Sequence, residues 1–169
     1  LAPLADLALV LTGEGQAWFE GKLLDGGKAM ELAGIAPLQL EAKEGLALLN
    51  GTAFMTSMAV LACEQAMLCL EALNGAAALS LLGFDGTSVA YTEGIVDARP
   101  HHGAHLISRH MNALVNGSLS TPGNPKTRVQ DPYSFRCVPQ VHGTALTALL
   151  HALDVIGVEA NSATDNPLV

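Results

Sequence analysis

The feature that most constrains the fold of this chain is a long apolar stretch without proline and with few charges. No proline occurs between Pro37 and Pro100, and residues 53–82 are mostly Ala, Leu, Met and other helix-forming residues. A helix of about 30 residues is about 45 Å long. Its only charged residues are Glu64 and Glu71, and apolar residues occupy every helical face. This pattern predicts a helix that is surrounded by other helices.

The remaining segments also favour helices. Residues 138–158 are a second long, almost uncharged stretch. Shorter helices, each with proline or glycine near one end, are expected at residues 1–12, 28–33 and 100–116. A short strand or turn is expected at residues 16–22, and irregular structure at residues 83–99. The predicted fold class is therefore all-α, a bundle of long helices.

The low charge of the chain indicates that much of its surface is covered. Half of the 169 residues are apolar and 14% are charged, against about 25% in ordinary soluble domains. We expect other subunits, or further parts of the polypeptide, to cover the apolar faces. Membrane insertion is disfavoured, because Glu64 and Gln65 lie near the middle of the longest helix and basic flanking residues are absent. The net charge of −8 lacks the basic footprint of a nucleic-acid-binding protein.

The cysteines suggest a cellular compartment for the protein, and the chain ends suggest that the sequence is part of a longer polypeptide. Cys63, Cys69 and Cys137 form no CxxC pair, and we expect them to be buried, reduced thiols of a cytoplasmic protein. The chain begins at Leu1 with no visible signal peptide, and it ends at Val169. We therefore expect residues 1–169 to be a single segment, the central helical core of a longer chain.

Polar chemistry is concentrated in residues 128–137, Arg-Val-Gln-Asp-Pro-Tyr-Ser-Phe-Arg-Cys. Asp131 suits the N-cap of a helix, and the proline after it suits the first turn. Tyr133 and Arg136 would then share a helical face. Gln130 would lie at the helix N-terminus, where free N–H groups favour an anion. Spacing alone leaves two interpretations, a capped helix with an ion-paired arginine or a ligand site.

Histidine and cysteine residues offer weaker candidates. His101 and His105 are four residues apart, and with His102 they could hold a metal ion on one helix. No carboxylate or cysteine has matching helical spacing, so no metal site is predicted. Cys137 lies five residues from His142, a spacing that disfavours cysteine catalysis on one helix.

Asn50 is a further candidate, because its polar amide stands between Leu49 and Gly51 in front of the longest helix. A buried amide costs free energy unless it is hydrogen-bonded. The residue is therefore either a helix cap, with the following Gly-Thr as the turn, or a donor directed into a pocket.

Motifs along the whole chain resemble one known enzyme family. In order, they are Leu1-Ala2-Pro3-Leu4, Gly13-Glu14-Gly15, residues 43–52 (Lys-Glu-Gly-Leu-Ala-Leu-Leu-Asn-Gly-Thr), Arg99-Pro100-His101, residues 130–137, Pro139-Gln140-Val141 and residues 161–168 (Asn-Ser-Ala-Thr-Asp-Asn-Pro-Leu). Together they are similar to the aromatic amino-acid ammonia-lyases, which include histidine, phenylalanine and tyrosine ammonia-lyases and related aminomutases. The combination is very specific.

The resemblance implies an all-α fold of the ammonia-lyase (fumarase/aspartase-like) type and a homotetramer with active sites shared between subunits. It implies a small aromatic amino acid as substrate. It also implies a methylidene-imidazolone (MIO) electrophile, formed from an Ala-Ser-Gly tripeptide that is expected just upstream of Leu1. The general-base tyrosine and part of the substrate pocket would also lie outside this chain.

The resemblance further assigns roles to five residues. Asn50 matches the Asn that hydrogen-bonds the imidazolone carbonyl oxygen, and Gln130 matches the Gln beside the same group. Tyr133 matches a pocket Tyr that places and tunes the electrophile. Arg136 matches the Arg that grips the substrate carboxylate with its two-pronged donor face, and Asn166 matches an Asn near that carboxylate.

The substrate is expected to be histidine, with urocanate as the product, because Asp131-Pro132-Tyr133 is similar to the histidine lyases. A phenylalanine or tyrosine lyase, or an aminomutase, is the alternative. Ala53 stands where histidine lyases usually carry Gln, and His142 also departs from their pattern. Two alternatives of other classes are a non-catalytic helical assembly module and a metal-binding domain that uses His101, His102 and His105.

Overall fold

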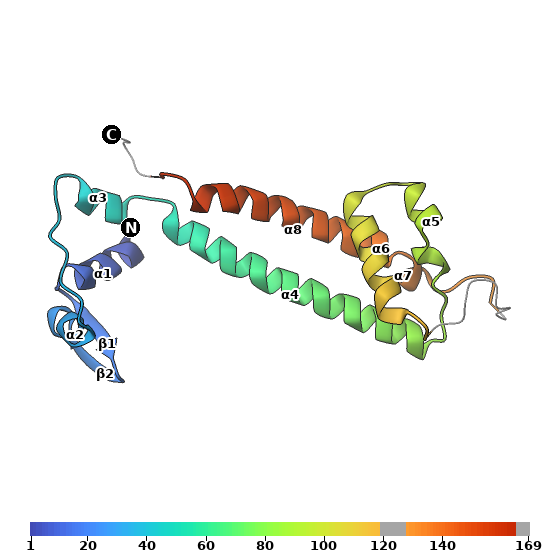
Figure 1. Ribbon diagram of the computed structural model, residues 1–169, viewed down its shortest axis with the longest axis horizontal. Helices are drawn as coiled ribbons and strands as arrows, with labels where there is room; N and C mark the ends of the chain where they lie inside the picture. The colour runs from blue at the N-terminus through green and yellow to red at the C-terminus, as the bar shows by residue number, and fades with distance from the viewer. Residues whose placement is uncertain (119–127, 165–169) are drawn as a thin grey trace. The chain divides into compact units, whose positions relative to one another are not determined.

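The computed structural model describes residues 1–118 and 128–164, and most of these residues are helical (Figure 1). In chain order the elements are α1 (Ala2–Leu11), β1 (Gln16–Phe19), β2 (Lys22–Asp25), α2 (Gly26–Ala33), α3 (Glu44–Leu49), α4 (Ala53–Gly83), the 3-10 helix η1 (Val89–Tyr91), α5 (Glu93–Asp97), α6 (His102–Val115), α7 (Tyr133–Arg136) and α8 (Val138–Ala160). The helical fold class predicted from the sequence is confirmed.

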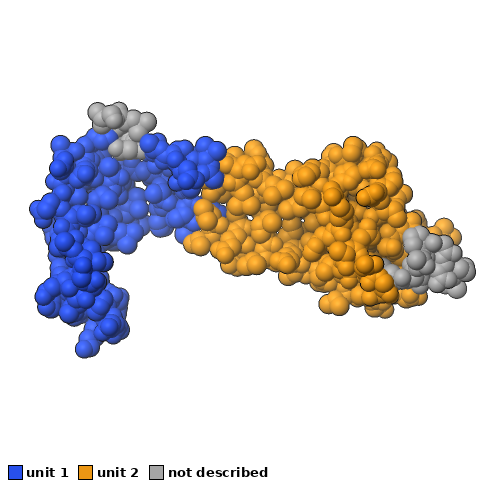
Figure 2. Space-filling view, in the orientation of Figure 1, with its two compact units in different colours: residues 1–59, 157–169 blue, residues 60–156 orange. Residues whose placement is uncertain are grey.

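The chain divides into two compact units (Figure 2). One unit comprises residues 1–59 and 157–169, and the other comprises residues 60–156. We refer to them as unit 1 and unit 2. The long helices α4 and α8 have residues in both units.

The predicted long apolar helix is α4, which begins at Ala53 and ends at Gly83. Its buried apolar residues form one stripe at intervals of seven, eight and three residues, comprising Cys63, Leu70, Ala78 and Leu81. Large apolar side chains on its other faces are exposed within this chain, including Met55, Leu61, Leu68 and Leu79. Residues 44–83 and Val138–Ala160 are long and apolar enough to cross a membrane, a test that core helices of soluble proteins also pass.

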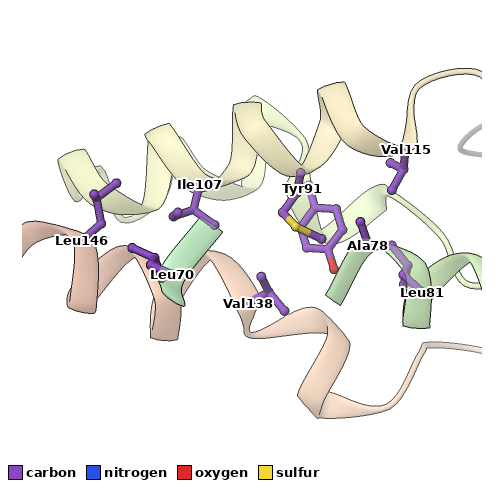
Figure 3. Packing of buried hydrophobic residues seen from close by; sticks show 9 residues of the cluster. Leu70, Ala78, Leu81, Tyr91, Ile107, Val115, Val138 and Leu146 are labelled. Atoms are coloured by element: carbon purple, nitrogen blue, oxygen red, sulfur yellow. The ribbon is translucent and has the colours of Figure 1, made fainter. Parts of the chain in front are cut away.

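The core of unit 2 is formed where α4, η1, α6 and α8 meet (Figure 3). Its buried side chains are Leu70, Ala78, Leu81, Tyr91, Ile107, Met111, Val115, Val138 and Leu146. Helices α6 and α8 approach each other closely at Gly103 and Gly143, since a Cβ atom on Gly103 would collide with the Gly143 carbonyl oxygen. The absence of side chains at these two positions therefore sets the distance between the helices.

Unit 1 contains a small antiparallel hairpin, which answers the open question of residues 16–22. Strand β1 pairs with β2, and Trp18 lies opposite Leu23. The Gly26 amide at the start of α2 donates to the Gly15 carbonyl at 2.9 Å, which ties the helix to the start of the hairpin. Gly34 closes α2 in the left-handed conformation, as its position after the predicted helix suggests.

Three predictions from the sequence are wrong in detail. Asp131 is not the N-cap of α7, because Pro132 occupies that position and makes no side-chain cap. Residues 83–99 are not irregular throughout, since they contain η1 and α5. Only Cys63 of the three cysteines is buried, and Cys69 is exposed on a face of α4 that this chain leaves uncovered. The Asp131 carboxylate instead accepts a hydrogen bond from the loop after α4.

Candidate active site

Three of the five predicted site residues line one cavity in unit 2. Gln130, Tyr133 and Arg136 border a space of about 590 Å³. Much of the remaining wall is apolar and comes from Leu81, Val89, Ile95 and Phe135. A few polar groups in a largely apolar cavity are typical of a small-molecule site.

Arg136 is held at its inner end and open at its outer end. Its Nε donates to the Asp131 carbonyl oxygen at 2.8 Å, and its guanidinium carbon lies 5.5 Å from the centre of the Tyr133 ring. Within residues 1–118 and 128–164, no acidic side chain pairs with Arg136 and its terminal nitrogens donate to no protein group. The guanidinium can therefore present both terminal nitrogens to an anionic ligand.

The buried Asp131 carboxylate anchors the segment 128–136 to the loop after α4. One oxygen accepts a hydrogen bond from the Thr87 amide at 2.7 Å, and the other lies 3.5 Å from Arg128 Nη2. Arg128 also donates to the carbonyl oxygens of Phe84 and Asp85, at 3.3 and 3.0 Å. Its guanidinium stacks over the Phe84 ring, 4.2 Å from the centroid. These contacts fix the chain that leads into α7.

Tyr91 is a buried cavity residue that sequence reasoning missed. Its hydroxyl donates to the Phe135 carbonyl oxygen at 2.7 Å, and its own carbonyl accepts from Ser108 Oγ and Asn112 Nδ2. Burial raises the pKa of Tyr91 to about 12, and the neighbouring Asp131 and Cys137 add to the effect. A single tyrosine in a segment without periodicity gives no sequence signal of such a position.

Asn50 belongs to unit 1 and is the residue after the last turn of α3. Its backbone amide donates to the Leu46 carbonyl at 2.8 Å, whereas its half-buried side chain has no hydrogen bond to the described residues. Nearby, Thr52 Oγ1 donates to Glu159 Oε1 at 2.7 Å, which ties this turn to the end of α8. Asn166 lies outside the described residues.

The histidines do not assemble a metal site in the part of the chain that the structure describes. No group of three or more His, Cys, Asp or Glu side chains there could hold a metal ion. His105 Nε2 lies 3.6 Å from Asp97 Oδ1, an ordinary pair on neighbouring helices. His142 is not placed as a base for Cys137, because its Nδ1 lies 2.8 Å from Asn74 Oδ1 and pairs with that oxygen. Burial lowers the pKa of His142.

Comparison with known proteins decides the family. The family model for aromatic amino acid lyases matches residues 1–169. The chain belongs to this family. A probable histidine ammonia-lyase of Thermoplasma acidophilum is 44% identical over 168 residues, which are 99% of this chain and 34% of that protein.

Solved structures support the same assignment. Histidine ammonia-lyase from Trypanosoma cruzi superposes with a TM-score of 0.85 at 34% identity, over 100% of this chain and 31% of its own. Phenylalanine aminomutase of Pantoea agglomerans gives a TM-score of 0.87 at 30% identity, over 99% of this chain and 36% of its own. This lyase-family chain thus has the helical fold of the ammonia-lyases and aminomutases, and it spans about a third of the length of the curated relatives that it matches.

Proposed function

We propose that residues 1–169 are the central helical core of a longer enzyme, an ammonia-lyase that converts L-histidine to urocanate. The observation that carries this proposal is the cavity of unit 2, where the terminal nitrogens of Arg136, which donate to none of the described residues, lie beside Tyr133 and Gln130. The family assignment supports the reaction class, and relatives named histidine ammonia-lyase support the substrate. The motif similarity of Asp131-Pro132-Tyr133 points to the same substrate.

Arg136 is proposed to bind the substrate carboxylate. A carboxylate is present in every amino-acid substrate, so the interaction does not depend on the ring. Two parallel charge-assisted hydrogen bonds from the terminal nitrogens would fix both the position and the direction of the amino acid. Since Nε is already bound to the Asp131 carbonyl, little side-chain freedom is lost when the ligand arrives. Asn166 is proposed to assist near the same carboxylate.

The side chains that the family resemblance assigns to an MIO group have the right chemistry for it, residue by residue. The side chains of Asn50, Gln130 and Tyr133 donate to no described residue, and neutral amides suit an imidazolone carbonyl oxygen. When bound, the group supplies an electrophile for the substrate amine. From the family resemblance, we propose that Asn50 hydrogen-bonds the carbonyl oxygen of the group and draws electron density from it. Gln130 is proposed to lie beside the same group. The Tyr133 hydroxyl is proposed to orient the group and to hold a proton near the reacting nitrogen.

The proposed assembly and location are supported by the same family membership. The exposed apolar faces of α4 are too extensive for a solvated surface and support coverage by other subunits. We propose a cytoplasmic homotetramer with active sites shared between subunits, and no nucleic-acid or membrane partner. A phenylalanine or tyrosine lyase or an aminomutase is the second candidate, favoured by the similarity to the Pantoea agglomerans aminomutase.

An ultraviolet assay of the complete protein tests this function. L-Histidine, L-phenylalanine and L-tyrosine each give an arylacrylate with its own absorbance band, and ammonia can be measured in parallel. We expect histidine to give urocanate and equimolar ammonia. A preference for phenylalanine or tyrosine would overturn the substrate, and a β-amino acid product would identify an aminomutase. No turnover of any of the three would favour a non-catalytic assembly module.

A further inference from the structure

The junction of α7 and α8 contains a carbonyl group that the helix itself cannot satisfy. Within a helix, the Phe135 carbonyl would accept a hydrogen bond from the amide of residue 139. Residue 139 is Pro139, which has no N–H and is almost fully buried. A buried carbonyl without a donor would cost free energy. The Tyr91 hydroxyl provides the missing donor at 2.7 Å.

The peptide group that Tyr91 holds is the one that leads into Arg136. The Phe135 carbonyl and the Arg136 amide belong to the same planar unit. Tyr91 holds its oxygen, and the Arg136 amide donates to the Pro132 carbonyl at 3.3 Å. The peptide plane is thus held at both ends, and the direction in which the Arg136 side chain leaves the backbone is fixed. The bond from Nε to the Asp131 carbonyl then fixes the guanidinium.

We propose that Tyr91 is a positioning residue for Arg136, acting through the Phe135 carbonyl that Pro139 leaves without a helical donor. This inference rests on the proposed function, because it takes Arg136 as the carboxylate-binding residue. It assigns Tyr91 no contact with substrate. Its effect is to orient the guanidinium before the amino acid binds.

Tyr91 is itself held firmly enough for this task. Its side chain is buried in the core of unit 2, with 1% of the residue exposed (Figure 3). Its carbonyl accepts from Ser108 Oγ at 2.5 Å and from Asn112 Nδ2 at 2.7 Å, both on α6. With its pKa raised to about 12, the hydroxyl keeps its proton throughout the neutral range and remains a donor. Core packing of the ring thereby sets the position of the hydroxyl that donates to the Phe135 carbonyl.

The test uses three variants of the complete enzyme, with Pro139→Ala alone as a fourth for comparison. Tyr91→Phe removes the hydroxyl and keeps the buried ring. Ser108→Ala is the matched control, because it removes a buried hydroxyl that donates to the Tyr91 carbonyl and leaves the packed ring, the Tyr91 hydroxyl and the Asn112 hydrogen bond in place. Pro139→Ala, added to Tyr91→Phe, restores an amide at residue 139 that can donate to the Phe135 carbonyl. Michaelis constant, turnover number and melting temperature are measured for each variant.

We expect Tyr91→Phe to raise KM about tenfold, a loss of about 1.4 kcal/mol, with kcat changed far less. The control should melt lower than wild type and retain its KM. The double variant should recover most of the KM although its melting temperature falls further, because Ala leaves a cavity at a buried position. Opposite changes in binding and stability would not arise if Tyr91 served folding alone.

Other results overturn the inference. It fails if wild type is active and Tyr91→Phe keeps its KM, if Ser108→Ala raises KM as much, or if the folded double variant shows no recovery. Should Tyr91→Phe not fold, the double variant is compared with Pro139→Ala: equal KM values support the inference and a tenfold difference overturns it. An inactive wild type would instead refute the proposed function and, with it, this inference.

Discussion

Arg136 combines two properties that a ligand-binding arginine needs. Its inner nitrogen is fixed on the Asp131 carbonyl, and its terminal nitrogens face a cavity without a described acidic partner. A lysine at this position would offer a point charge instead of a planar pair of donors. Whether the residue matters for ligand or for folding is therefore open to direct measurement.

We predict that Arg136→Lys lowers kcat/KM for the amino-acid substrate, and that Arg136→Ala lowers it further. Removing a charge-assisted partner costs about 2–5 kcal/mol of binding, which is about 30- to 4,000-fold. Arg109→Lys, on an exposed arginine of α6 outside this cavity, is the matched control and should leave kcat/KM unchanged. A purely structural role would appear as a lower melting temperature with normal kcat/KM per folded molecule.

Asn50 offers a second measurement that separates catalysis from capping. If its amide polarises the electrophile, Asn50→Ala should reduce kcat by about 10²–10³-fold, as the loss of one transition-state donor does. If the residue only ends α3, the loss should be about 1 kcal/mol of stability with turnover intact. Steady-state kinetics and a melting curve on the same variant distinguish the two. The side chain has no partner among the described residues, which favours the kinetic effect.

Because His142 is partly buried, we predict that the stability of the folded protein depends on pH. Burial holds its pKa below the ordinary value of 6.5, so the folded protein favours the neutral ring. As the pH falls below 6.5, the unfolded chain binds a proton before the folded protein does. The contribution of this residue is therefore present above pH 6.5 and is lost on acidification. Urea unfolding of the complete protein between about pH 5 and 8 gives the free energy of unfolding at each pH. This free energy should fall less steeply on acidification in His142→Gln than in wild type, and equal slopes would contradict the prediction.

At the scale of elements, the close approach of α6 to α8 is the most sensitive contact. A Cβ atom on Gly143 would lie 2.5 Å from the Ala104 amide nitrogen and 2.7 Å from its Cα. Gly143→Ala should therefore destabilise the protein by about 1–3 kcal/mol, the usual cost of overpacking. Gly157→Ala, on the same helix with no atom within 4 Å of the added group, should stabilise it by about 0.5–1 kcal/mol. Similar melting temperatures for the two variants would refute this account of the crossing.

The long helices could be predicted from the sequence, whereas the connections between them could not. Composition locates α4 and α8 within a few residues, and the absence of proline adds to the signal for α4, because helix propensity is a local property. The task of Asp131 was missed, since its partner Thr87 is 44 residues away and no periodicity links the two. Tyr91 was missed for the same reason. Motif similarity, not spacing, singled out Gln130 and Arg136, and the cavity around them emerges only from tertiary packing.

At the scale of the whole molecule, we predict that this segment expressed alone self-associates and shows no lyase turnover. Leu79 and Met55 of α4 are 71% and 66% exposed within this chain, and burying such side chains is favourable. The segment also lacks the Ala-Ser-Gly from which the electrophile would form. Analytical ultracentrifugation and an ammonia assay check both parts, with the complete protein as the positive control. A soluble monomer would contradict the first part, and ammonia release would contradict the second.

In the proposed homotetramer, the open faces of α4 also link folding to mass action. A helix with one packed stripe gains the rest of its stabilisation only when other subunits pack against it. The free energy of folding therefore includes the free energy of association, which depends on concentration. Dilution then acts as a denaturant, and the thermal midpoint should rise with the total amount of protein in solution. In a cell, the yield of such a folded tetramer would depend on how quickly newly made chains associate, before their exposed apolar helices contact other unfolded polypeptides.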